Sequence, residues 1–193
     1  MSRRGKIFVL SGPSGSGKTT LHNALLCDKK TRKSLIKTIS ATTRLPRAGE
    51  KNKVHYLFFS KKLFQSRIKK GYFLEWQKVF NDYYGTPKAQ AKRVLRAGRS
   101  VLLCIDVKGA KVVFDLFPDA VGIFVKAPSL DALRKRLQGR GTEGKKVIAH
   151  RLAVARKELK EAKRYRYVIV NDQIKKAVKE LKSIVEQELS KTT

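Results

Sequence analysis

The sequence is poor in acidic residues, in cysteine and in long apolar stretches. It has 15 Asp and Glu against 45 Lys and Arg, and only two cysteines. No apolar run approaches the roughly 18 residues that a membrane-spanning helix needs. The basic start of the chain leads into a short apolar run, so we expect no cleavable signal peptide. Cys27 and Cys104 both have apolar neighbours, which disfavours a disulfide framework and predicts reduced thiols in a cytoplasmic protein.

The formal net charge of +30 indicates a ligand that carries phosphate groups. The charge is +9 over residues 1–50, +11 over 51–100, +4 over 101–150 and +6 over 151–193, so no detachable basic tail exists. We find neither zinc-finger spacing nor an RNA-binding sheet motif. A nucleic-acid partner is therefore disfavoured but not excluded, and a merely solvated basic surface explains the charge equally well.

Apolar runs of strand type alternate with amphipathic stretches along most of the chain. This alternation in 193 residues predicts a single domain with an α/β fold, in which helices flank a parallel sheet. We expect strands at 6–10, 100–107, 121–125 and 167–170, and helices at 19–27, 110–117, 129–137, 147–162 and 174–189.

Residues 38–90 interrupt the alternation and predict an inserted small subdomain. A polar loop at 38–49 precedes an expected strand at 54–59, a helix at 63–70 and an aromatic, strand-like stretch at 72–84.

Residues 12–19 have the sequence Gly-Pro-Ser-Gly-Ser-Gly-Lys-Thr, which fits the phosphate-binding pattern G-x-x-x-x-G-K-[ST]. Gly15 and Gly17 allow successive backbone N–H groups to turn inward, and the following helix directs its positive end at the same point. Lys18 supplies a charge for the β- and γ-phosphates, and the Thr19 hydroxyl can bind Mg²⁺. The strand before and the helix after the motif make this a specific signal.

Two of the scarce acids stand among large apolar residues. Glu75 lies between Leu74 and Trp76, and Asp106 ends the buried run at 101–105. Burying a carboxylate costs several kcal/mol unless it has partners. Both acids are therefore candidates to accept hydrogen bonds from a polar ligand, although an exposed edge position for Glu75 and a capping role for Asp106 stay open.

Several separated motifs together resemble the guanylate kinase family, over about residues 5–189. The motifs are residues 11–19, 42–50, 73–76 (Phe-Leu-Glu-Trp), 83–86 (Tyr-Tyr-Gly-Thr), 105–109 (Ile-Asp-Val-Lys-Gly), 139–142 (Gly-Arg-Gly-Thr) and 170–172 (Val-Asn-Asp). The resemblance implies a P-loop NTPase-type core at 1–37, 91–137 and 157–193, a GMP-binding subdomain at about 38–90 and a helical lid at about 138–156. It also implies ATP-dependent phosphorylation of GMP, with Mg²⁺ as cofactor.

The resemblance assigns site residues by motif match. The GMP-binding residues would be Ser40, Arg44, Arg47, Tyr56, Glu75, Tyr84, Thr86 and Asp106. The ATP-binding residues would be Gly12, Pro13, Ser14, Gly15, Ser16, Gly17, Lys18, Thr19, Thr20, Arg140 and Asn171, with a loop-capping role for Asn171 equally open. The catalytic residues would be Lys18, Arg44, Arg136 and Arg151, and Thr19 would bind the metal.

Two positions depart from the family pattern. Cys104 stands where the family usually has an acid, and Lys108 stands where it has a glutamine. The first change puts the positioning of Mg²⁺ in question. Two other functions stay open: a related P-loop kinase acting on another small phosphate such as a ribosyl bisphosphate, and a basic nucleic-acid-binding protein on a vestigial kinase fold. We expect a monomer or a homodimer.

Overall fold

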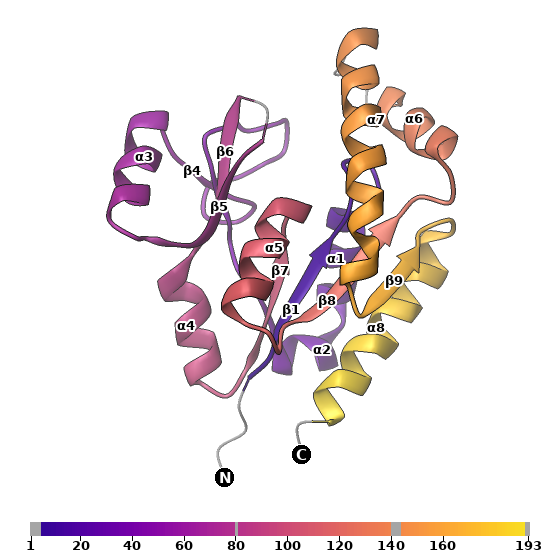
Figure 1. Cartoon of the computed structure of the whole chain (residues 1–193). Coiled ribbons are helices and arrows are strands. Elements are labelled where there is room, and N and C mark those ends of the chain that lie inside the picture. The colour runs from indigo at the N-terminus through magenta and orange to yellow at the C-terminus, as the bar shows by residue number, and fades with distance from the viewer. Residues whose placement is uncertain (1–4, 80, 140–143, 192–193) are drawn as a thin grey trace.

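The computed structural model describes residues 5–79, 81–139 and 144–191, and its centre is a five-stranded sheet (Figure 1). The strand order is β2-β7-β1-β8-β9, and every neighbouring pair is parallel. The parallel α/β fold predicted from the sequence is thereby confirmed. The strands are β1 (Ile7–Ser11), β2 (Leu35–Lys37), β7 (Ser100–Cys104), β8 (Val121–Lys126) and β9 (Tyr167–Val170).

Both faces of this sheet are covered by helices, because its central strands have runs of consecutive apolar residues that point to both sides. In β1, Phe8 and Leu10 pack on one side and Ile7 and Val9 on the other. The first side is covered by α1 (Lys18–Cys27) and α8 (Ile174–Ser190), and the second by α4 (Lys88–Arg96) and α5 (Val107–Leu116). Among the described residues, no helix has the length and apolar character needed to cross a membrane.

A second sheet, with order β4-β3-β6-β5, lies within the stretch that we predicted as an insertion. It contains β3 (Ala41–Thr42), β4 (Leu57–Phe58), β5 (Phe73–Val79) and β6 (Asp82–Pro87). Helix α3 (Lys61–Lys69) covers it through Phe64, whose ring stacks on Phe73 at a centroid distance of 4.3 Å. The aromatic stretch near 72–84 is therefore a pair of antiparallel strands.

The expected strand at 54–59 is wrong in its extent, because only Leu57 and Phe58 form it. Residues 53–55 form a turn instead, in which Lys53 has a left-handed backbone with φ of 64°. The Asn52 side chain accepts hydrogen bonds from the backbone N–H groups of Lys53 and Phe58, which closes this turn.

Two helices were not predicted at all, α2 (Lys29–Ser34) and α4. Helix α2 has six residues, of which four are cationic and none is apolar. Helix α4 does have an apolar face with Ala91 and Val94, but no side chain caps its start at Pro87.

Helices α6 (Leu130–Gln138) and α7 (Lys145–Lys160) form a pair above the carboxyl ends of the sheet strands (Figure 1). Leu133 and Leu137 of α6 pack with Ile148 and Ala155 of α7 in a small core of their own. A 3₁₀ turn, η1 (Glu161–Arg164), then leads into β9. Most of α7 falls within the predicted lid at 138–156, while residues 140–143 lie outside the described part of the chain.

A buried carboxylate joins the last helix to the rest of the domain. Glu188 of α8 is 1% exposed, and its carboxylate accepts hydrogen bonds from the Tyr167 hydroxyl at 2.7 Å and from Lys191 Nζ at 2.7 Å. Arg166 and Lys6 lie 3.3 and 3.6 Å from it. Burial alone would raise the pKa of Glu188, but these hydrogen bonds and charges lower it to about 2.

We predict that Glu188→Gln lowers the free energy of unfolding by about 1–3 kcal/mol at neutral pH, because buried partners lose a charged acceptor. The folded-state pKa lies below the unfolded one, so this contribution is present above about pH 4.5 and disappears as the pH falls toward 2. Urea unfolding between pH 2.5 and 7 measures it. Glu186→Gln, an exposed change on the same helix, is the control. Equal stability of the two variants at pH 7 would contradict the role of Glu188.

Candidate functional site

The glycine-rich loop between β1 and α1 has the strained backbone that its sequence predicts. Gly12, Gly15 and Gly17 have φ values of 139°, 87° and 93°, a region that side chains rarely allow. At Gly12 a side chain is also excluded by space, since an added Cβ would lie 2.1 Å from the carbonyl oxygen of Val125. The loop therefore packs directly on the end of β8 and leads its backbone into the N-terminus of α1.

Asn171, which follows β9, holds this loop from the other side. Its Nδ2 group donates to the carbonyl oxygen of Ser16 at 2.9 Å, and an added Cβ at Gly17 would lie 2.1 Å from the same Nδ2. Arg136 of α6 in turn donates to the Asn171 carbonyl oxygen at 2.7 Å. Asn171 is 4% exposed, so in this structure it braces the loop backbone.

The side chains predicted for the ATP side gather around the same loop. Lys18 Nζ donates to the carbonyl oxygens of Gly12 at 2.6 Å and Pro13 at 2.9 Å, so its amine lies across the loop. Arg151 of α7 donates to Ser14 Oγ at 3.0 Å. Thr19 and Thr20 are exposed on the first turn of α1. Arg140, the remaining residue predicted for this side, lies outside the described residues.

A second basic group lies at the loop that follows β3. One terminal nitrogen of Arg44 donates to both Glu50 carboxylate oxygens at 2.9 Å, and its guanidinium lies 5.6 Å from the centre of the Tyr56 ring. The Tyr56 and Tyr84 rings meet edge to face at 6.3 Å. Arg47 is exposed, and its backbone N–H donates to Glu50 at 2.8 Å. Arg44, Tyr56 and Tyr84 are thus brought together.

The two acids singled out by the sequence also come together. Glu75 of β5 is 5% exposed, and its Oε1 accepts a 2.7 Å hydrogen bond from the hydroxyl of Thr86, its neighbour on β6. Asp106 caps α5 by accepting from the Gly109 N–H at 2.7 Å. An added Cβ at Gly109 would lie 2.6 Å from Glu75 Oε2 and 3.4 Å from Asp106 Oδ1. A glycine is required there to let the carboxylates approach.

The electrostatics of this pair favour a neutral Glu75 in the absence of a ligand. Burial raises the pKa of Glu75 to about 7, the Thr86 hydrogen bond lowers it, and the charge of Asp106 raises it. The expectation that Glu75 is an exposed edge residue is therefore excluded, while the capping role of Asp106 is observed. Ser40, the other residue predicted near the base, precedes β3, and its carbonyl oxygen accepts from the Leu57 N–H at 2.9 Å.

Cys104 ends β7 between the two groups of side chains. Burial raises the pKa of its thiol, although Lys18 and Lys37 are close enough to lower it. The charge of Cys104 also acts on Tyr56, whose pKa is raised to about 12 mainly by burial. The position that lacks the usual acid therefore lies between the phosphate loop and the tyrosines.

Glu158 of α7 is a site residue that the sequence analysis did not select. It is half-buried, and Lys18, Asp106 and Lys108 all act on its carboxyl group. Burial raises the pKa of Glu158 to about 7, with Lys18 and Lys108 lowering it and Asp106 raising it. The sequence did contain a signal for Glu158. It is one of few acids in the chain, and it stands next to Leu159 on the apolar face of α7. Glu50, which holds Arg44, was also not selected.

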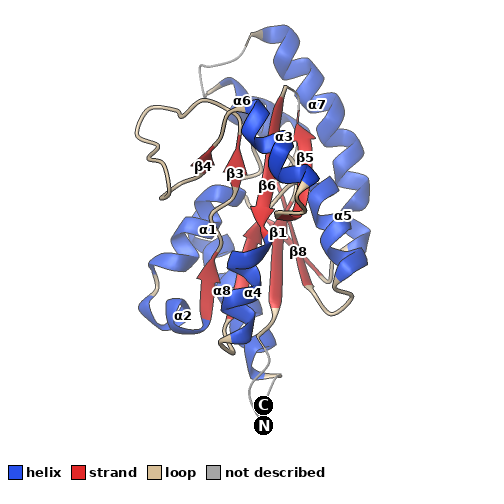
Figure 2. Cartoon of the chain, turned by 90° about the vertical axis from the view of Figure 1, so that its left-hand side faces the viewer, coloured by secondary structure: helices blue, strands red, loops and turns tan. Residues whose placement is uncertain are grey.

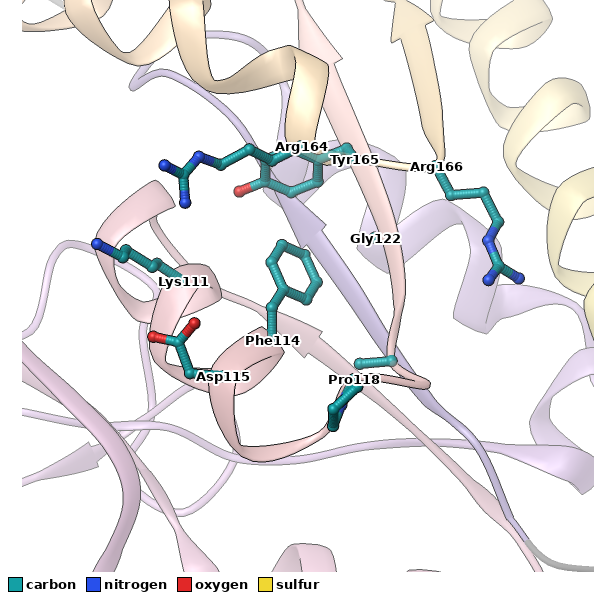
Figure 3. Close-up of a pocket in the computed structure, with 9 residues that line it drawn as sticks. Lys111, Phe114, Asp115, Pro118, Gly122, Arg164, Tyr165 and Arg166 are labelled. Atoms are coloured by element: carbon teal, nitrogen blue, oxygen red, sulfur yellow. The ribbon is translucent and has the colours of Figure 1, made fainter.

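A separate hollow of about 550 Å³ lies away from these residues, between α5, the start of β8 and η1 (Figure 3). The Phe114 and Tyr165 rings meet edge to face at 5.2 Å along its wall. Lys111 and Arg164 lie on one side of it, and Arg166 points away, toward Glu188. None of the predicted site residues lines this hollow, so it is not part of the candidate site.

The family model described as guanylate kinase matches residues 4–188. The chain belongs to the guanylate kinase family. It is 46% identical over 183 residues to a guanylate kinase of Neisseria meningitidis, covering 95% of this chain and 88% of that one. A guanylate kinase of Symbiobacterium thermophilum is 43% identical over 189 residues, covering 98% and 88%. The crystal structure of guanylate kinase from Anaplasma phagocytophilum superposes with a TM-score of 0.80 at 31% identity, covering 97% and 87%.

For this member of the guanylate kinase family, we predict that Asn171→Asp lowers kcat/KM for ATP by about tenfold to a hundredfold. The change replaces a buried donor with a carboxylate oxygen that faces the Ser16 carbonyl, which costs about 1–3 kcal/mol. Steady-state kinetics at varied ATP concentration measure the effect. Asp172→Asn, the exposed neighbour, is the control and should match the unmodified chain. An unchanged kcat/KM in Asn171→Asp would show that the loop does not depend on this brace.

Proposed function

We propose that this chain transfers the γ-phosphoryl group of ATP to a phosphate oxygen of GMP and releases ADP and GDP. The observation that supports this best is the pairing of the buried Glu75 with the half-buried Asp106 at the same end of the core as the phosphate loop. The pair supplies carboxylate acceptors, whereas the loop supplies backbone and lysine donors for phosphates. Membership of the guanylate kinase family supports the same assignment.

On the GMP side, the carboxylates read the base. Guanine presents the N1–H and the N2 amine as neighbouring donors, and adenine lacks that arrangement. A site whose buried acceptors lose their partners rejects the wrong base strongly. Ser40, Glu75, Thr86 and Asp106 contact the guanine, and Arg44, Arg47, Tyr56 and Tyr84 hold the phosphate. Arg44 reaches the phosphate by exchanging the Glu50 carboxylate for two phosphate oxygens, with which a guanidinium pairs in bidentate fashion.

On the ATP side, the loop from Gly12 to Thr19 holds the phosphates, and Thr20 lies next to the end of this loop. Asn171 lies near the adenine. The donor set fits Mg²⁺, because the exposed Thr19 hydroxyl on the first turn of α1 is a hard oxygen ligand. The described residues contain no cluster of three or more His, Cys, Asp or Glu side chains, as expected where substrate phosphates supply most ligands. Bound Mg²⁺ would neutralise charge between the β- and γ-phosphates.

The transfer needs no side-chain base, because the attacking GMP phosphate oxygen is already an anion. The bond between the γ-phosphorus and the β,γ-bridging oxygen breaks as the new P–O bond forms, and catalysis consists of positioning and charge stabilisation. Lys18, Arg44, Arg136 and Arg151 stabilise the charge on the transferring group. Arg136 and Arg151 come from α6 and α7, so closure of these helices over the site would bring them in and exclude water.

The reaction recycles GMP in purine nucleotide metabolism, and we place it in the cytoplasm, where reduced cysteines persist. Cys27 and Cys104 are both free thiols. Such a site works with one copy of the chain, so either a monomer or a homodimer is compatible with it.

The test is turnover of ATP with GMP and with AMP as acceptors, followed by coupled detection of ADP. We predict a kcat/KM for GMP at least a thousandfold above that for AMP, since buried hydrogen-bonding sites discriminate by factors of about 10⁴–10⁵. Lys18→Ala should abolish turnover with GMP and leave the melting temperature within a few degrees. Preferential turnover of a ribosyl bisphosphate, or full activity of Lys18→Ala, would overturn the proposed function.

A further inference from the structure

Positive charge is least balanced by acids between residues 29 and 105, which contain 20 Lys and Arg. Between residues 29 and 105 the only acids are Glu50, Glu75 and Asp82. Each of them already has a partner: the Arg44 guanidinium, the Thr86 hydroxyl and the Thr43 hydroxyl, respectively. Helices α2 and α4 in this stretch contain no acid, and all the cations of α2 and three of the four on α4 are exposed. Neither the phosphate loop nor the GMP side uses these helices.

The C-terminal ends of α2 and α4 meet at the amino edge of the core sheet. Helix α2 runs directly into β2, and α4 leads through a short turn into β7, which pairs with β2 in parallel. The Arg99 guanidinium donates to the carbonyl oxygen of Arg32 at 3.0 Å, so two arginines are fixed beside each other. Both helices are visible from the side shown in Figure 2. We call the exposed cations here the amino-edge basic face: Arg32, Lys33, Lys92, Arg93, Arg96 and Arg99.

Within residues 5–79, 81–139 and 144–191, no acidic side chain forms an ion pair with this face. In the part of the chain that the structure describes, the ion pairs involve other cations, such as Arg44, Lys182 and Lys191. A cation near a helix C-terminus is stabilised by about 0.3–1 kcal/mol through the helix dipole. That effect acts on the two cations in the last turn of each helix, Arg32 and Lys33 on α2 and Arg93 and Arg96 on α4. It supplies no counter-charge, and none of the six cations of the face has an ion-pair partner among the described residues.

Attraction of nucleotides to the kinase site does not account for the face either. The phosphate loop lies at the carboxyl edge of the sheet and the basic face at the amino edge. The five residues of β7 that separate the two edges span about 17 Å. At physiological ionic strength the Debye length is about 8 Å, so the field of the face is largely screened at the phosphate loop.

We propose that the amino-edge basic face binds the sugar–phosphate backbone of a nucleic acid, as a function separate from GMP phosphorylation. Four of its six cations are arginines, whose forked guanidinium groups pair with two phosphate oxygens at once. The face carries no aromatic side chain, so it contacts the backbone and does not read bases. Among the described residues, none of the exposed large apolar side chains lies on α2 or α4, which argues against insertion into a membrane surface.

The experiment measures binding of the full-length chain to a fluorescent single-stranded RNA of mixed sequence, between 50 and 300 mM KCl. The face variant is Arg32→Gln, Lys33→Gln, Arg93→Gln and Arg96→Gln. The control variant removes the same charge from exposed positions elsewhere, with Lys163→Gln, Lys175→Gln, Lys176→Gln and Lys179→Gln. A third variant, Arg93→Gln with Arg96→Gln, changes α4 alone and keeps the test valid if the fourfold variant does not fold. GMP kinase turnover of every variant is measured in parallel.

We expect the face variant to bind RNA at least tenfold more weakly at 150 mM KCl, with the slope of log K against log salt reduced by up to about 2.8. In the α4 variant the slope should fall by roughly half as much, because two of the four cations are removed. The affinity of the control variant for RNA should fall less than twofold. Kinase turnover should be the same in all of them, so this result is independent of the proposed function. Equal losses in the face and control variants, no RNA binding at 150 mM KCl, or tighter binding to phosphatidylglycerol vesicles than to RNA would overturn the proposal.

Discussion

The close approach of Glu75 and Asp106 is the constraint on which the arrangement of the two sheets depends. Glu75 belongs to the second sheet and Asp106 caps α5 behind the core strand β7, so the two parts of the molecule meet where both carboxylates lie against Gly109. The approach is possible because position 109 is glycine and because Thr86 donates to one carboxylate oxygen. Burial and the charge of Asp106 make ionisation of Glu75 unfavourable, and a guanine base with two neighbouring donors would stabilise the ionised form.

The phosphate loop is held by donors, with Lys18, Arg151 and Asn171 bonded to its backbone or side chains, while its glycines remove side chains where other groups lie close. Asn171 braces Ser16 and lies against Gly17, while Gly12 packs on the carbonyl oxygen of Val125. The contact at Gly12 comes from the carboxyl end of the adjacent strand β8, and the contacts at Ser16 and Gly17 come from the residue after β9, the next strand of the sheet. The loop is therefore shaped before any nucleotide arrives, and its N–H groups require little reorganisation to bind phosphates.

The sequence predicted the buried parallel strands, the phosphate loop and the pair of acids, because each has a strong local signature. It did not predict α2, which lacks apolar residues, or α4, whose start at Pro87 has no side-chain cap. It also did not predict the turn at 53–55, which depends on hydrogen bonds to the Asn52 side chain. Glu158 was missed because its role depends on where α7 lies relative to Lys18 and Asp106, and the sequence does not state that placement. Asn171 could be selected as a site residue, but its contact with Ser16 spans 155 positions and only the fold reveals it.

Calorimetry of GMP binding in two buffers of different ionisation enthalpy tests the role of Glu75 most directly. A guanine donor pair requires the ionised carboxylate, and the pKa of Glu75 is about 7 before binding. GMP binding near pH 6.5 should therefore release a substantial fraction of a proton, and its affinity should rise with pH up to about 8. Glu75→Gln should bind GMP more weakly and lose that proton release. Binding without proton release at pH 6.5 in the unmodified chain would contradict the assignment of Glu75 to the guanine base.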